Sequence, residues 1–118
     1  MKEIKVFEQA KAKKASFKES GINSTMYWAY ENSKKAGNET IDFSDVIWDG
    51  DIEAIVKTCR ANGISYITIS STFSGLITSL AAFEKQGCKL DGLTEVKANY
   101  TDWETGEKEI LPAIIVRM

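Results

Sequence analysis

The sequence contains no histidine, a single proline and two cysteines among its 118 residues. Without histidine, the chain can build neither a His-dependent catalytic triad nor a His-ligated metal site. Cys59 and Cys88 fit no CxxC or metal-type spacing, and small secreted domains usually carry more cysteines, so a reduced, cytoplasmic setting is expected. No apolar run approaches the ~20 residues of a membrane-spanning helix, and the first residues do not resemble a signal peptide. We therefore expect no metal, no cofactor and no membrane contact.

The composition is that of a globular domain, with 43% hydrophobic and 27% charged residues. The charge is distributed unevenly along the chain. Residues 1–37 carry eight lysines against four glutamates, whereas residues 38–118 carry seven basic against thirteen acidic residues. We expect one domain over 1–118, with a helical, Lys-rich N-terminal part and an acidic α/β body. The lysines are expected to be solvated; nucleic acid is an unlikely partner because no recognised binding motif accompanies them.

Two helices are expected in the N-terminal part. Apolar residues recur at helical intervals over 3–19, but they form only a thin stripe. Asn23 or Ser24 can cap a second helix that ends at Ala36, with Gly37 as the residue that follows it.

The remaining residues indicate alternating strands and helices. The expected elements are a strand over 40–43, a helix over 51–62 capped by Asp49 or Asp51, a strand over 66–70, a helix over 73–86, and strands over 93–101 and 108–117. The fold class is therefore α+β: two helices, then β-α-β-α-β-β, forming a four-stranded mixed sheet with helices packed on it. Pro112 lacks an N–H group, so the last strand is expected to be an edge or to carry a bulge. An apolar C-terminal edge strand could also pair with a second copy and form a homodimer.

One segment is a candidate ligand site because it follows the strongest predicted strand and precedes a helix. Its residues are Ser70, Ser71, Thr72, Ser74 and Gly75. Hydroxyl groups and free helix N–H groups at such a point suit a phosphate or a carboxylate. The alternative is that Ser71, Thr72 or Ser74 only caps the helix, and the segment matches neither GxGxxG nor a Walker motif.

A second candidate is an acidic stretch whose members are Asp42, Asp45, Asp49, Asp51 and Glu53. The spacing does not match a calcium loop, and helix capping explains several of these residues. An acidic surface could instead compete with nucleic acid for the basic groove of a nuclease, as a counter-defence (anti-CRISPR-like) inhibitor does. The stretch therefore contributes Asp42, Asp45, Asp49 and Asp51 to a candidate partner surface.

Trp48 and Trp103 fall in predicted loops. Such residues more often cover a small core, but exposed tryptophans would be anchors for a partner, so both join the candidate partner surface. Cys59 lies on the apolar face of its helix and is expected to be packed. Cys88 is expected to be more accessible, although no neighbour makes it a candidate nucleophile.

Six short segments resemble an uncharacterised family of short proteins from gut Firmicutes, whose genes often lie near mobile-element genes. The segments are Asp45–Trp48, the helix end from Cys59 to Gly63-Ile64, Thr68–Ser74, Gly87-Cys88, Gly92–Val96 and Pro112-Ala113. The resemblance covers residues 42–113 and excludes the first two helices. It implies a bacterial, cytoplasmic accessory protein of plasmid, phage or conjugative-element origin, with no functional residue to transfer.

These patterns together predict a small cytoplasmic binding protein without catalytic activity that acts through a protein partner. The competing hypotheses are the counter-defence inhibitor with an acidic face and a small-anion binding domain that uses the segment from Ser70 to Gly75.

Overall fold

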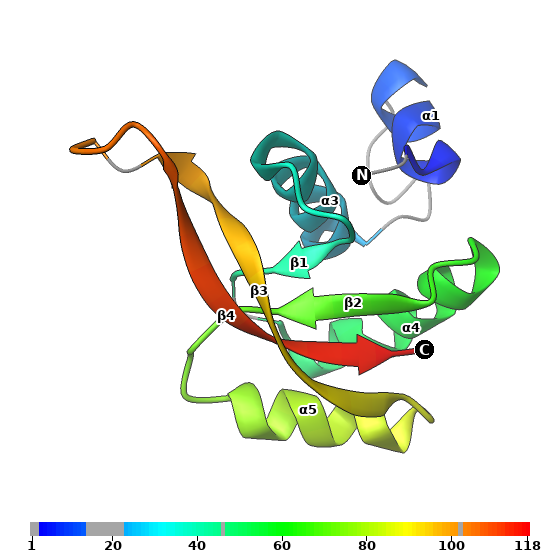
Figure 1. Ribbon diagram of the computed structural model, residues 1–118. Helices are drawn as coiled ribbons and strands as arrows, with labels where there is room; N and C mark the ends of the chain where they lie inside the picture. Colours follow the sequence, from blue (N-terminus) through cyan, green and yellow to red (C-terminus); the bar gives the residue numbers. More distant parts are fainter. Residues whose placement is uncertain (1–2, 14–22, 46, 102) are drawn as a thin grey trace.

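The computed structural model describes residues 3–13, 23–45, 47–101 and 103–118. Its elements are α1 (Lys5–Lys13), α3 (Ser24–Ala36), β1 (Asp42–Phe43), α4 (Asp49–Ala61), β2 (Tyr66–Ile69), α5 (Leu76–Lys85), β3 (Lys89–Thr101) and β4 (Lys108–Arg117). The strands form one mixed sheet, with α1 and α3 toward one side of it and α4 and α5 toward the other (Figure 1). The predicted α+β class and element order are confirmed.

The second helix, α3, begins and ends at the residues that the sequence indicates. The Asn23 side chain accepts a hydrogen bond from the Met26 N–H at 3.1 Å, which satisfies one of the free donors of the first turn. At the other end Gly37 has φ of 79°, a left-handed conformation that glycine adopts without strain, and its N–H donates to the carbonyls of Ser33 and Lys34.

The first helix is attached to α3 by an aromatic and polar contact. Phe7 is fully buried, and its ring stacks on that of Tyr30 with centroids 4.7 Å apart. The Tyr30 hydroxyl donates to Glu8 at 2.7 Å, and the Lys34 ammonium donates to the same carboxylate at 2.6 Å. α1 covers the first part of the helix expected over 3–19, and residues 14–22 lie outside the described part of the chain.

The starts of α4 and α5 differ from the sequence predictions. α4 begins two residues earlier than expected, and Trp48, which makes no side-chain capping bond, is its N-cap. Asp51 therefore lies inside the helix, where its carboxylate accepts hydrogen bonds from the side chains of Asn23 and Thr25. α5 begins at Leu76 rather than residue 73, with Gly75 as its N-cap. At α4 the carboxylate that was expected to cap the helix is used in a tertiary contact, which local propensity does not reveal.

The strand order is β1-β2-β4-β3, in which β1 and β2 are parallel and both β2 and β3 run antiparallel to β4. β4 is an inner strand over Ile114–Arg117, so the prediction of a C-terminal edge strand is wrong there, whereas the half of β4 before Ile114 pairs with β3 alone. A homodimer that pairs through β4 stays a prediction, and only the half of this strand before Ile114 has a side without a partner strand. The long β3–β4 hairpin extends well beyond β2, and its tip projects away from the helices (Figure 1).

Pro112 fits in β4 because of its position in the ladder. The Lys97 N–H and carbonyl bond to the Asn38 side chain, so the pair Lys97–Ile110 does not exchange ladder hydrogen bonds. Bonded and non-bonded pairs alternate in an antiparallel ladder, so Pro112, opposite Glu95, also occupies a non-bonded pair. The position of its missing N–H therefore faces away from β3, toward the β2 side of β4. The pairs with β2 begin only at Ile114, so Pro112 removes no ladder hydrogen bond. The register shifts lie elsewhere, so the bulge expected at Pro112 is also wrong.

The apolar core lies between the sheet and the helices α4 and α5, and it continues to α1 and α3 through Phe7, Met26 and Tyr30. Alternation along β2 places Ile67 and Ile69 in this core, while Tyr66 and Thr68 line a hollow on the opposite face. Cys59 is fully buried as predicted. Cys88 is only 6% exposed, so its predicted accessibility is wrong. Among the described residues, no helix has the length and apolar character needed to cross a membrane.

Candidate functional site

Asp42 forms a buried polar cluster between β1 and β2. Its two carboxylate oxygens accept hydrogen bonds from the hydroxyls of Thr68 (2.7 Å) and Ser70 (2.6 Å), and its N–H donates to Ser33 Oγ at 2.8 Å. Burial raises the pKa of the Asp42 carboxyl, and the hydrogen bonds from Ser70 and Thr68 partly oppose this shift. The side chain is 7% exposed, so Asp42 joins two strands and does not belong to the predicted partner surface.

The candidate ligand segment is organised around this cluster. The Ser70 hydroxyl donates to a carboxylate, which makes it a poor ligand for an anion. Ser71 is buried, whereas Thr72 and Ser74 are exposed. The N-cap of α5 is Gly75, and the helix start has no side-chain capping bond. The predicted capping by Ser71, Thr72 or Ser74 is therefore wrong.

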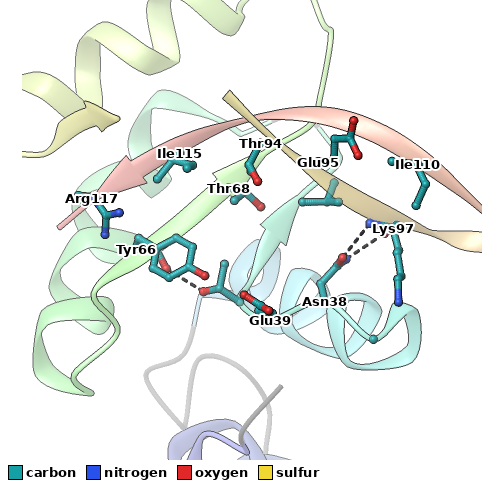
Figure 2. A pocket seen from close by; sticks show the side chains of 13 residues that line it. Asn38, Glu39, Tyr66, Thr68, Thr94, Glu95, Lys97, Ile110, Ile115 and Arg117 are labelled. Atoms are coloured by element: carbon teal, nitrogen blue, oxygen red, sulfur yellow. Dashed lines mark hydrogen bonds between the residues drawn. The ribbon is translucent and has the colours of Figure 1, made fainter. Parts of the chain in front are cut away.

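A larger hollow lies on the concave face of the sheet, with a volume of about 590 Å³ (Figure 2). Thr68, Thr94 and Ile115 line the sheet side of this concave hollow. The Asn38 side chain crosses its rim, donating to the Lys97 carbonyl at 2.9 Å and accepting from the Lys97 N–H at 2.8 Å. This pair of bonds joins the segment after α3 to β3.

The charges around the concave hollow are of both signs. Arg117 stands at one end, paired with Asp91 and 5.5 Å from the centroid of the Tyr66 ring. Its guanidinium lowers the pKa of the Asp91 carboxyl. Glu39, Glu95 and Lys97 complete the charged lining. The mixed charge favours no single-sign ligand, and the hydroxyls suit an uncharged or zwitterionic one.

A second hollow has an aromatic lining. The Trp28–Trp48 cleft has a volume of about 400 Å³ and is lined by Ser24, Thr25, Trp28, Ala29, Asn32, Phe43, Ser44, Asp45 and Trp48. Trp28 projects from the rigid helix α3, Trp48 immediately precedes α4, and their exposed fractions are 57% and 69%. The ring of Trp28 is held edge-on to Tyr27, with centroids 5.2 Å apart. The expectation that Trp48 covers the core is therefore wrong.

The other residues of the predicted partner surface do not assemble into one face. Asp45 is exposed and lines the Trp28–Trp48 cleft, whereas Asp51 is engaged with Asn23 and Thr25. The side chain of Asp49 lies outside the described part of the chain. Trp103 is 90% exposed in the connection between β3 and β4, and it is not among the residues that line the cleft.

The cysteines and carboxylates show no metal centre. The described residues contain no group of three or more side chains placed to hold a metal ion. Burial raises the pKa of Cys59 to about 12 and also raises that of Cys88, which makes both thiols poor nucleophiles.

A comparison with protein families gives a match to the model described as "Domain of unknown function (DUF7698)" over residues 25–118. The chain belongs to this family. The match begins within α3, so it reaches further toward the N-terminus than the resemblance over residues 42–113. No curated protein and no solved structure matches the chain.

The family domain contains both tryptophans of the cleft, Asp42 and Asn38. Reasoning from the sequence missed Trp28 and Asn38 as functional or structural residues. The three consecutive large side chains Met26, Tyr27 and Trp28 were a usable signal for Trp28. One helix turn cannot bury three consecutive side chains on a single face, so at least one of them must be exposed. No local signal identified Asn38, since its contact is with a strand 59 positions away.

Proposed function

We propose that the chain is a protein-binding module without catalytic activity and that the Trp28–Trp48 cleft is its interface. The observation that supports this proposal is the pair of tryptophans, both more than half exposed, lining one cleft. Large aromatic side chains are usually sheltered in a domain of this size, and a hollowed aromatic surface is typical of a binding site.

The arrangement suits the anchoring role that tryptophan has in interfaces. Trp28 is positioned by a capped helix, and Trp48 by the start of a second helix, so little conformational entropy is lost when a partner orders them. Truncating a tryptophan at the centre of an interface typically costs about 2 kcal/mol or more, roughly thirtyfold in affinity.

The proposal is tested by affinity capture from a bacterial lysate, using nuclease-treated and untreated halves. We compare the wild-type chain with Trp28→Ala, Trp48→Ala and the matched control Trp103→Ala, which removes an exposed tryptophan outside the cleft. A partner that survives nuclease treatment should be lost from both cleft variants and retained by the control. Equal capture by all four proteins, or loss only with Trp103→Ala, would contradict the proposed interface.

The accessory role in a mobile element and the cytoplasmic location remain part of this proposal. The resemblance to the Firmicutes family supports them. The counter-defence hypothesis rests on fewer residues than the sequence indicated, because Asp42 is buried and Asp51 is engaged within the fold. Capture of a nuclease by the Trp28–Trp48 cleft would support it.

A second candidate function is the binding of a small polar molecule in the concave hollow. Its volume of about 590 Å³ and the Thr68 and Thr94 hydroxyls favour this alternative. A metabolite library screened by thermal shift should then contain a compound that raises the melting temperature, and Thr94→Val should abolish the rise. A rise that persists in Thr94→Val would place the compound elsewhere.

A further inference from the structure

The chemistry of the Trp28–Trp48 cleft indicates what part of a partner enters it. The faces of indole rings carry negative electrostatic potential and attract cations. Among the described residues that line the cleft, Asp45 is the only ionisable one, and its side chain is exposed. The indoles and the carboxylate both attract positive charge, so the cleft is suited to a positively charged group.

The chemistry of the lining favours a planar cation over a compact one. A guanidinium can lie flat on an indole while its N–H groups pair with a carboxylate, whereas an ammonium is more strongly hydrated and acts as a point charge. An ionised carboxylate has two oxygens with several acceptor directions, so Asp45 can accept a guanidinium in addition to its contacts within the fold. The Asn32, Ser24 and Thr25 side chains add polar groups at the edge of the cleft.

The charge of the surrounding body acts in the same direction. Residues 38–118, which supply Asp45 and Trp48, carry thirteen acidic against seven basic residues, and the whole chain, including the Lys-rich part with α3, has a net charge of −2, which favours association with a basic partner. We propose that the Trp28–Trp48 cleft receives an arginine side chain of the protein partner, which contacts an indole and pairs with Asp45. This proposal depends on the proposed function and specifies the partner chemistry.

The first test uses small probes and no partner. N-acetyl-arginine amide, N-acetyl-citrulline amide and N-acetyl-lysine amide are titrated into ¹⁵N-labelled protein while the three indole N–H resonances are followed. Citrulline is the uncharged isostere of arginine. Arginine should shift the Trp28 and Trp48 resonances but leave that of Trp103 unchanged, and citrulline should bind at least about fivefold more weakly. Equal binding of citrulline, or no shift with arginine, overturns the proposal, and equal binding of lysine overturns the assignment to a guanidinium.

The variant Asp45→Asn tests the carboxylate with almost no change in size. It should weaken arginine binding about fivefold, and its melting temperature, measured alongside, separates a loss of binding from a loss of folding. Trp48→Phe keeps an aromatic face and provides a second variant, which should retain part of the binding. Full arginine affinity in Asp45→Asn would overturn the pairing with Asp45.

The failure of this proposal differs from failure of the proposed function. If Trp28→Ala and Trp48→Ala abolish partner capture while Asp45→Asn and excess N-acetyl-arginine amide leave it intact, the arginine proposal falls and the interface stands. If the probe binds at the cleft while both tryptophan variants still capture the partner, the interface falls. If excess probe displaces the partner from the wild-type chain, both are supported.

Discussion

Asp42 is a single residue whose environment contributes to how the stability of the chain depends on pH. Both of its oxygens accept hydroxyl hydrogen bonds, and burial raises the pKa of its carboxyl. A raised pKa means that the folded state holds its proton to higher pH than the unfolded state does. The contribution of Asp42 to the free energy of unfolding must therefore fall as the pH rises from the unfolded-state pKa toward the higher folded-state pKa.

Replacing Asp42 with asparagine removes this titration. The stability of the wild-type chain relative to Asp42→Asn should decrease as the pH rises above the ordinary aspartate pKa, because only the wild-type chain must ionise a buried group. Urea denaturation at several pH values measures the difference. Asp45→Asn controls for the loss of one carboxylate charge at an exposed position. A difference that increases with pH would mean that folding lowers the pKa of Asp42.

The two thiols provide a second test at this scale. Cys59 and Cys88 are free and buried, and burial raises the pKa of both. A thiol reagent at neutral pH should therefore label neither cysteine in the native protein and both after unfolding. Rapid labelling of Cys88 under native conditions would contradict its burial beside Met118, whose sulfur lies 3.9 Å from the Cys88 sulfur.

At the scale of elements, Asn38 acts as a short substitute for a neighbouring strand. Its side chain satisfies both the N–H and the carbonyl of Lys97 on the outer edge of β3. An uncovered edge strand is a surface for unwanted pairing, and this contact covers one position of it. The same contact holds the rim of the concave hollow against the sheet (Figure 2).

The variant Asn38→Ala removes both bonds and leaves the backbone groups of Lys97 without this partner. It should destabilise the chain by about 1–3 kcal/mol. Asn62→Ala is the matched control, because the exposed Asn62 side chain bonds only to the Thr58 carbonyl of its own helix end, and its loss should cost about 0.5 kcal/mol. Equal losses in the two variants, measured by urea denaturation, would show that the Asn38 contact contributes no more than a local surface bond.

Elements whose signals are local could be predicted from the sequence. The cap of α3 at Asn23 and its end at Gly37 depend on residues within a few positions, as does the strand β2. The inner position of β4 depends on which strands meet in space, and a proline rule applied to Pro112 alone could not reveal it. The start of α4 was predicted wrongly for a related reason. The Asp51 carboxylate accepts hydrogen bonds from Asn23, the N-cap of α3, and from Thr25 in α3 instead of capping its own helix.

At the scale of the whole molecule, the two faces of the sheet have different roles. One face forms the apolar core with α4 and α5, to which α1 and α3 also contribute, and the other face carries the concave hollow. The Trp28–Trp48 cleft lies between the α3 helix and the segment that joins β1 to α4. The sequence indicated Trp48 and Asp45 for a partner surface, but only the fold could add Trp28 and exclude Asp42.

The central claim is that a protein partner covers the Trp28–Trp48 cleft. The chain contains only three tryptophans, so 5-fluorotryptophan labelling gives three ¹⁹F resonances, which single Trp→Phe variants assign. Addition of the partner isolated by affinity capture should shift the Trp28 and Trp48 resonances and leave the Trp103 resonance in place. A shift confined to Trp103, or no shift in a complex that forms, would contradict the claim.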